Sequence, residues 1–173
     1  MNITLIGFMG SGKTTVANAL SQQLEIEQND LDEMVLQRTG LTIPEYFEQY
    51  GEAKFRKLEM DNLQLALATG GILSTGGGTP MQANNFKLIQ EANTATVFLN
   101  AQDNTITHHL IHDGIEERPL FKQLGIDGII KLKHERQLTY EQLADVIIDV
   151  DHKSPELIVN ELMEKLSEVN SND

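Results

Sequence analysis

Residues 7–15 read GFMGSGKTT and directly follow the apolar run ITLI at residues 3–6. The fixed positions of the phosphate-binding pattern G-x-x-x-x-G-K-[ST] are filled by Gly7, Gly12, Lys13 and Thr14. The apolar run predicts a short buried strand, and the spacing of apolar residues over 13–24 predicts a helix. A glycine-rich loop between a strand and a helix is typical of nucleotide-binding proteins. We therefore expect this loop to bind the phosphates of a nucleotide.

The residue types of this loop suit a polyphosphate. Glycine lets backbone N–H groups approach phosphate oxygens closely, because no Cβ is in the way. The following helix directs the positive end of its dipole at the same anion. Lys13 is expected to neutralise the β- and γ-phosphates, and the Thr14 hydroxyl is expected to hold Mg²⁺. The predicted nucleotide-binding residues in the loop are Gly7, Gly10, Ser11, Gly12, Lys13, Thr14 and Thr15.

Length and charge limit the number of domains and the kinds of partner that the chain can have. The chain has 173 residues, and we expect one domain over residues 1–169 followed by a polar tail at 170–173. The 26 acidic residues against 13 Lys and Arg give a net charge of -13, so neither nucleic acid nor an anionic membrane is an expected partner. There is no cysteine for a disulfide, no apolar run of membrane-spanning length and no pattern of a signal peptide. We expect a cytoplasmic protein.

Predicted strands alternate with predicted helices along the chain. The strands are expected at 3–6, 26–29, 72–75, 94–99 and 146–150. The helices are expected at 13–24, 31–38, 43–50, 51–68, 84–92, 103–111, 126–144 and from residue 155 onward. Such alternation favours a parallel sheet that is covered by helices on both faces. Ligands of such sheets bind beyond the carboxyl ends of the strands.

Four further motifs lie outside the phosphate-binding loop. They are Asp30-Leu31-Asp32, Gly51-Glu52 with Phe55-Arg56 and Glu59, Thr75-Gly76-Gly77-Gly78, and Arg118-Pro119-Leu120 ahead of Arg136 and Tyr140. A P-loop alone does not separate a switch, a motor and a small-molecule kinase. These motifs must therefore indicate what receives the phosphoryl group.

The motifs admit both functional and structural interpretations. Alternation in an extended segment puts the carboxylates of Asp30 and Asp32 on one side, where one could hold a metal ion and the other could accept a proton. The same residues could instead cap the following helix. Arg56 and Glu59 could be a solvent-exposed ion pair. Three glycines at a strand end fit close approach of the backbone to a ligand.

Together, the five motifs resemble the shikimate kinase family, and the resemblance runs from Ile3 to about Asp149. It implies an α/β P-loop kinase fold, with a five-stranded parallel sheet in the order 2-3-1-4-5 and helices on both faces. It also implies a substrate-binding segment at about 31–63 and a mobile lid at about 112–124. The implied reaction transfers the γ-phosphoryl group of ATP to the 3-hydroxyl of shikimate, with Mg²⁺, in aromatic amino-acid biosynthesis. A monomer is expected.

The resemblance also implies roles for individual residues. Lys13, Asp32 and Arg118 match catalytic residues: Asp32 the base, and Arg118 the lid arginine that closes over the transferring phosphate and binds the nucleotide. Asp30 matches the residue associated with the metal, together with Thr14. The implied shikimate site consists of Asp32, Arg56, Gly76, Gly77, Gly78 and Arg136. A fork of arginine donors is well suited to a planar carboxylate.

Three departures from the family pattern affect these expectations. Gln28-Asn29 replaces the usual apolar or aromatic residue before D-x-D, so the second strand is expected to be short. The adenine-flanking arginine is absent from the region 108–112, whose three histidines are expected at the surface. The segment from Arg136 to Tyr140 lacks the family's proline, so the sequence leaves open the direction in which the Arg136 side chain points.

Two alternatives remain beside a shikimate kinase. One is a related P-loop kinase of another hydroxy acid such as gluconate, which would need a different acid-binding constellation. The other is a nucleotide-binding regulatory pseudokinase. Binding of ATP alone requires neither Asp32 nor Arg136, so their presence favours an active kinase.

Overall fold

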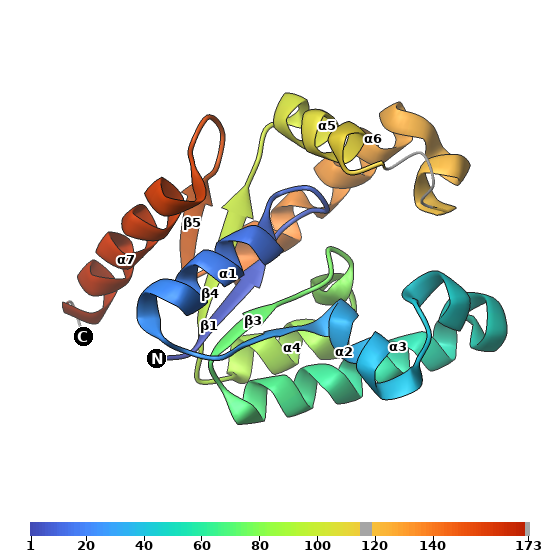
Figure 1. Cartoon of the computed structure of the whole chain (residues 1–173), viewed down its shortest axis with the longest axis horizontal. Coiled ribbons are helices and arrows are strands. Elements are labelled where there is room, and N and C mark those ends of the chain that lie inside the picture. The colour runs from blue at the N-terminus through green and yellow to red at the C-terminus, as the bar shows by residue number, and fades with distance from the viewer. Residues whose placement is uncertain (115–118, 172–173) are drawn as a thin grey trace.

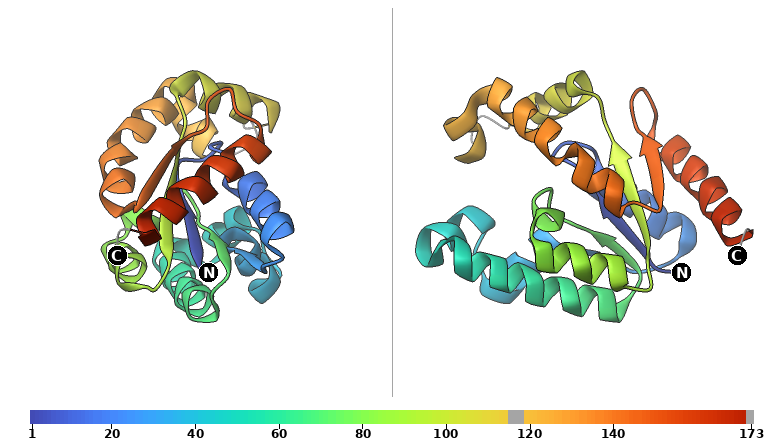
Figure 2. Two further views of the ribbon diagram at one scale, coloured as in Figure 1. Left: turned by 90° about the vertical axis from the view of Figure 1, so that its left-hand side faces the viewer. Right: turned by 180° about the vertical axis from the view of Figure 1, so that it is seen from behind.

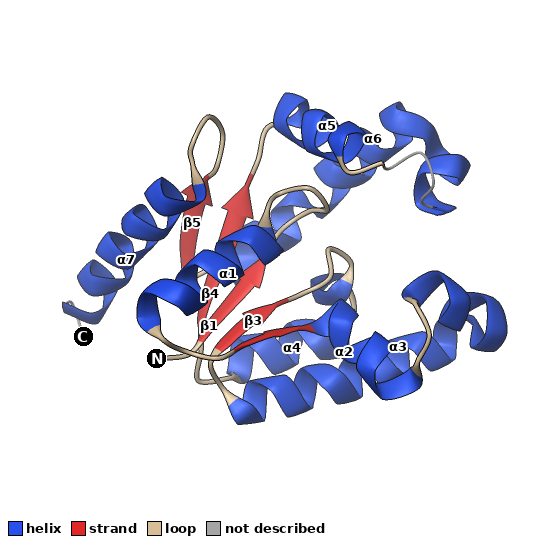
Figure 3. Cartoon of the chain, in the orientation of Figure 1, coloured by secondary structure: helices blue, strands red, loops and turns tan. Residues whose placement is uncertain are grey.

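The computed structural model describes residues 1–114 and 119–171 of the chain. Within them, one five-stranded sheet has the order β2-β3-β1-β4-β5, and all of its neighbouring strands pair in parallel. The strands are β1 Ile3–Ile6, β2 Gln28–Asp30, β3 Ile72–Ser74, β4 Ala95–Asn100 and β5 Val146–Asp149. Their arrows run in the same sense in Figure 3. The expected α/β class and strand order are confirmed.

Helices cover both faces of this sheet. The helical elements are α1 Lys13–Leu24, α2 Leu31–Thr39, α3 Ile43–Thr69, the 3-10 helix η1 Thr79–Met81, α4 Ala83–Glu91, α5 Asp103–His112, α6 Pro119–Leu143 and α7 Pro155–Ser171. Helices α1 and α7 pack together on one face, while α4 and α6 lie on the other and α3 runs beside α4 (Figures 1 and 2).

Strand β1 lies at the centre of the sheet and positions the site. Its apolar side chains Ile3, Leu5 and Ile6 are fully buried, because β3 and β4 flank the strand and helices cover both faces. The loop after β1 and the glycine triplet after β3 emerge at the same edge, since the two strands are parallel neighbours. The fold therefore brings two of the predicted motifs together.

Strand β2 is short, as its polar sequence suggested, but it begins two residues later and ends one residue later than expected. It pairs only with β3, with Gln28 opposite Ile72, and Ile72 N donates to Glu27 O over 3.0 Å. An edge strand has one neighbour and keeps one side open, so it tolerates polar residues that a central strand would not. The strand was predicted, but its bounds of 26–29 were wrong, because the apolar pattern that usually marks a strand is missing here.

Two of the long helices are bent at glycine. Gly51 has φ 81° and ψ 172°, and this divides α3 into the two helical segments that the sequence predicted. Gly125, with φ 65° and ψ 179°, similarly divides α6. Residues 119–124 of the predicted lid form the first helical segment of α6, whereas 115–118 lie outside the described residues.

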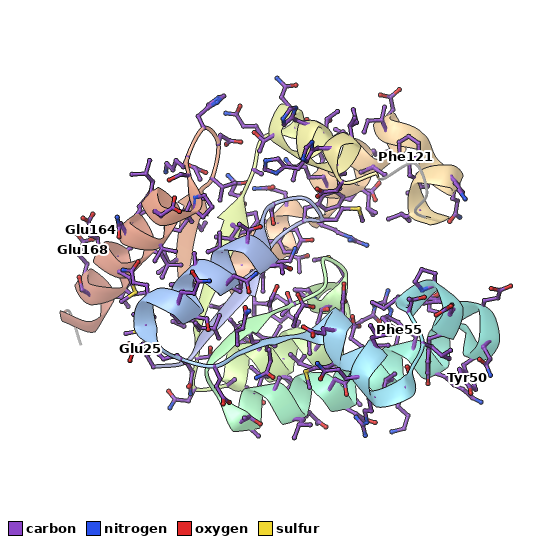
Figure 4. All side chains as sticks on the ribbon, in the orientation of Figure 1. Glu25, Tyr50, Phe55, Phe121, Glu164 and Glu168 are labelled. Atoms are coloured by element: carbon purple, nitrogen blue, oxygen red, sulfur yellow. The ribbon has the colours of Figure 1, made fainter. Side chains whose placement is uncertain are left out.

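Acidic side chains mark the outer surface of the fold. Glu164 and Glu168 are exposed and project from α7 away from the sheet, as Figure 4 shows. Among the described residues, no helix combines the length and apolar character that a membrane crossing requires.

Candidate active site

The phosphate-binding loop adopts a conformation that requires glycine. Gly7, Gly10 and Gly12 have φ values of 149°, 79° and 92°. A Cβ on Gly7 would lie 2.8 Å from the carbonyl oxygen of Leu99, which is closer than such atoms approach. The backbone of the loop therefore packs directly against the end of β4, and a side chain at this position would displace it.

Lys13 bonds through its side chain to the backbone of the phosphate-binding loop. Its side chain is buried, and Nζ donates to the carbonyl oxygens of Gly7 at 2.8 Å and Phe8 at 3.0 Å. Within the described residues, no side chain caps the start of α1 at Gly12. The first N–H groups of that helix have no partners inside it and so face the loop as potential anion donors.

Asp30 caps α2 and also contacts Thr14, so the capping interpretation is confirmed and the metal-binding one stays a prediction. Oδ1 accepts from the backbone N–H of Asp32 at 2.9 Å and of Glu33 at 3.4 Å, so the side chain caps α2. Oδ2 accepts from the Thr14 hydroxyl at 3.0 Å. A hydroxyl oxygen and a carboxylate oxygen therefore lie side by side next to the loop, and oxygen donors of these kinds fit Mg²⁺.

Asp32 lies beside the glycine triplet. Its side chain is exposed in the first turn of α2, and a Cβ on Gly76 would be 3.2 Å from Asp32 Oδ1. The carboxylates of Asp30 and Asp32 thus have different neighbours, one at Thr14 and the other at the triplet. The described residues contain no cluster of three or more His, Cys, Asp or Glu with the spacing of metal ligands.

Two arginines from distant helices meet at Gly78. A Cβ on Gly78 would lie 3.5 Å from Arg136 Nη2 and 3.6 Å from Arg56 Nη2. A Cβ on Gly77, in turn, would be 3.2 Å from Met9 N, so the triplet touches the phosphate-binding loop. Two guanidinium groups at such a position repel each other unless an anion lies between or beside them. The convergence that the resemblance implied is therefore present in the structure, without the family's proline before Tyr140.

A buried carboxylate fixes Arg56. Glu59 is 5% exposed, and it accepts from Arg56 Nη1 at 2.9 Å, Thr79 Oγ1 at 2.9 Å and Asn85 Nδ2 at 3.3 Å. Asn85 also donates to the carbonyl oxygen of Thr79 at 3.1 Å. The solvent-exposed ion pair considered for Arg56 and Glu59 was wrong, because η1 and α4 cover the glutamate. Sequence reasoning missed Thr79 and Asn85, although Thr79 directly follows the triplet.

Tyr140 holds the triplet from the other side. Its hydroxyl donates to Gly77 O at 2.6 Å, and its ring stacks on Phe98 with the centroids 5.1 Å apart. Burial raises the pKa of Tyr140 to about 12, although the neighbouring Arg136 acts in the opposite direction. The phenol is therefore neutral at ordinary pH and serves as a hydrogen-bond donor.

The three histidines after β4 differ in their surroundings. His108 and His112 are exposed, as expected, but His109 is half-buried with Nδ1 2.6 Å from Gly10 O. The expected surface position was wrong for His109, because α5 packs against the loop at this point. Arg118 lies outside the described residues, so its implied role stays a prediction.

Comparison with known proteins places this geometry in a family. A family model described as Shikimate kinase matches residues 9–167. A shikimate kinase from Enterococcus faecalis is 36% identical over 167 residues, covering 96% of this chain and 99% of that protein. The solved shikimate kinase from Acinetobacter baumannii in complex with shikimate is 29% identical with a TM-score of 0.86, covering 99% of this chain and 94% of that one.

A more distant likeness concerns the fold alone. A gluconokinase from Sinorhizobium meliloti has a TM-score of 0.58 and 19% identity, over 99% of this chain and 94% of that one. The family model and the close relative both extend over nearly the whole of this chain. The chain therefore belongs to the shikimate kinase family.

Proposed function

We propose that this chain transfers the γ-phosphoryl group of ATP to the 3-hydroxyl of shikimate, giving shikimate 3-phosphate and ADP. Membership of the family makes it an ATP-dependent small-molecule kinase. The observation that carries the choice of acceptor is the meeting of Arg56 and Arg136 at Gly78, beside the phosphate-binding loop. Arginine donates to a planar carboxylate through two parallel N–H groups, so this pair suits the acid group of shikimate.

The residue roles follow from these positions. Lys13 would exchange its carbonyl partners in the loop for phosphate oxygens, which carry more negative charge. Asp32, beside Gly76, would accept the proton of the attacking hydroxyl. Arg118 would stabilise the negative charge of the transferring phosphoryl group, as arginines do in other phosphoryl-transfer enzymes. Phosphoryl transfer depends mainly on such positioning and charge, so no covalent intermediate with the chain is needed.

Thr14 and Asp30 would hold Mg²⁺ together with the nucleotide. Their adjacent oxygens supply one hydroxyl and one carboxylate. Mg²⁺ is usually bound by one or two protein oxygens, with phosphates and waters completing its shell. When bound, the ion neutralises charge on the phosphates. The cytoplasmic location and the monomeric state expected from the sequence remain predictions.

The alternatives differ from this proposal in what they require. A gluconate kinase shares the fold, but its substrate would have to use the arginine pair and the glycine triplet in another way. A regulatory pseudokinase would not need a carboxylate at the triplet, nor two arginines that meet at Gly78 with one of them held by Glu59. Their joint presence supports an active kinase whose acceptor carries a carboxylate.

A coupled assay of ADP release tests the proposal. The chain would be given ATP and Mg²⁺ with shikimate, quinate or gluconate in turn, and the product would be identified by mass spectrometry and phosphorus NMR. We expect shikimate to stimulate release strongly, quinate and gluconate far less, and the phosphate to appear on the 3-hydroxyl. Greatest activity with gluconate would support the other kinase. Nucleotide binding with background rates for all three acids would support the pseudokinase.

A further inference from the structure

Helix α5 packs directly on the phosphate-binding loop. A Cβ on Gly10 would lie 3.1 Å from both Cγ and Cδ2 of Leu110 and 3.5 Å from the carbonyl oxygen of Ile106. The side chains of Ile106 and Leu110 are fully buried at this contact. The helix and the loop therefore form one packed unit, and a polar group from α5 can act on the backbone of the loop.

His109 supplies that polar group. Its Nδ1 lies 2.6 Å from the carbonyl oxygen of Gly10. A backbone carbonyl only accepts hydrogen bonds, so Nδ1 must carry the proton, either in the neutral ring or in the imidazolium. The neighbouring His108 is exposed, with its ring centroid 6.2 Å from that of His109. The contact is thus specific to one of the two adjacent histidines.

The contact fixes the peptide plane between Gly10 and Ser11. In a trans peptide the carbonyl and the following N–H point in opposite directions. His109 holds the Gly10 carbonyl from one side, and the Ser11 N–H donates to Phe8 O at 3.1 Å from the other. Gly10 has φ 79°, and glycine rotates between conformations at little cost. Without the donor on His109, only the bond from Ser11 N–H to Phe8 O would hold this peptide, and it could turn and direct its carbonyl oxygen toward the incoming phosphate.

We propose that His109 is a positioning residue for the nucleotide, which it serves by holding the carbonyl oxygen of Gly10 against α5 and so keeping it away from the phosphates. A ligand then meets a loop that is already arranged, and this reduces the ordering needed on binding. The inference rests on the proposed nucleotide site in this loop. Nothing in the family comparison or in the sequence motifs assigns such a role to this histidine.

Three variants of His109 and one control separate the hydrogen bond from simple packing. His109→Asn keeps an N–H donor near the place of Nδ1, whereas His109→Leu and His109→Phe remove it and keep apolar bulk. His108→Leu is the matched control on the exposed neighbour. The readouts are the Kd of a fluorescent ADP analogue, KM for ATP, KM for shikimate, kcat and the melting temperature of each variant.

We expect His109→Leu and His109→Phe to raise the Kd for the ADP analogue and KM for ATP about three- to tenfold, the ratio expected for one hydrogen bond. KM for shikimate should stay within about twofold, since the hydrogen bond of His109 goes to the phosphate-binding loop and not to the arginine pair. His109→Asn should recover most of the loss, and His108→Leu should match the wild type. If His109→Leu does not fold, the Kd of His109→Phe for the ADP analogue tests the inference instead.

Unchanged ADP binding in a folded variant without the donor would overturn the inference. Equal losses in His109→Asn and His109→Phe would also overturn it, because they would indicate packing of the ring rather than the hydrogen bond. The proposed function fails separately, if the wild type binds the ADP analogue but shows no turnover with shikimate. In that case the binding measurements still test the role of His109.

Discussion

The Thr14 hydroxyl donates a hydrogen bond of 3.0 Å to Asp30 Oδ2, which joins the start of α1 to the end of β2. The other oxygen of the same carboxylate caps α2 through the N–H groups of Asp32 and Glu33. Asp30 therefore combines a structural contact and a proposed metal contact in one side chain. Because the two contacts use different oxygens, substitutions can separate them.

Asp30→Asn should weaken the response to Mg²⁺ while leaving the fold intact. Asparagine caps helices about as well as aspartate through its single oxygen, but an NH2 group then takes the place of Oδ2. This group can donate to the Thr14 hydroxyl but cannot bind a metal ion, and the side chain lacks the negative charge. We expect the Mg²⁺ concentration for half-maximal rate to rise at least about tenfold, with little change in melting temperature. Asp30→Ala should in addition lose about 1 kcal/mol of stability with the cap. An unchanged Mg²⁺ titration for Asp30→Asn would remove Asp30 from the metal site.

Asp32→Asn should lower kcat and leave nucleotide affinity nearly unchanged. A general base typically contributes about 10²–10⁴-fold to a rate, and Asp32 lies at the glycine triplet rather than at the phosphate-binding loop. Steady-state kinetics over ATP and shikimate would show a fall in kcat of that order, with KM for ATP within about twofold. Glu33→Gln, which changes an exposed carboxylate next to it, is the control. A wild-type kcat in Asp32→Asn would mean that another group accepts the proton.

The sequence predicted those parts of the molecule that short segments determine. The phosphate-binding loop is one contiguous pattern, and the alternation of strands and helices is sufficient for the parallel sheet. The predicted helix boundaries at 50/51 and before residue 126 coincide with the bends at Gly51 and Gly125, because a glycine with positive φ interrupts a helix, whereas the helical segment at 119–124 was not predicted. The arginine pair was identified only through resemblance, since nothing local relates Arg56 to Arg136.

Contacts between distant segments could not be predicted in the same way. Thr79 and Asn85 matter because α4 and η1 fold over a carboxylate of α3, and no spacing in the chain encodes that arrangement. His109 looked like its exposed neighbours until the packing of α5 placed it on the loop. Strand β2 was misplaced because its polar residues gave no apolar period to follow.

Thr79→Val should reduce both stability and shikimate affinity. Valine has nearly the same shape but cannot donate to Glu59, whose buried carboxylate would lose one of its hydrogen bonds. We expect a loss of about 1–3 kcal/mol in the free energy of unfolding, measured by urea titration. KM for shikimate should rise severalfold, because Glu59 then holds Arg56 less firmly. Thr69→Val on the exposed side of α3 should cost less than about 0.5 kcal/mol. Equal effects of the two substitutions would contradict this account.

Arg136→Ala should act mainly on the acid substrate. The guanidinium lies at Gly78 opposite Arg56 and above the Phe8 ring, 5.8 Å from its centroid. We expect KM for shikimate to rise at least about tenfold, and Arg136→Lys to recover little of it, because lysine keeps the charge but lacks the planar fork. Lys131→Ala, which removes an exposed cation from the same helix, should leave KM unchanged. A normal KM for shikimate in Arg136→Ala would exclude this residue from the site.

Tyr140→Phe should lower the free energy of unfolding near neutral pH, and this difference from the wild type should shrink in alkaline solution. The substitution leaves Gly77 O without its donor, and we expect a loss of about 1 kcal/mol in the free energy of unfolding near neutral pH. Burial raises the pKa of Tyr140 from 10.0 to about 12, so the folded state favours the neutral phenol. The phenol therefore stabilises the wild type fully below pH 10, and this contribution falls as the pH rises toward 12, because the unfolded chain ionises first. Urea titrations at several pH values should show a constant difference between wild type and variant from pH 6 to 9 and a shrinking one above pH 10. A difference that stays constant throughout the alkaline range would show that the folded state does not suppress ionisation of this phenol.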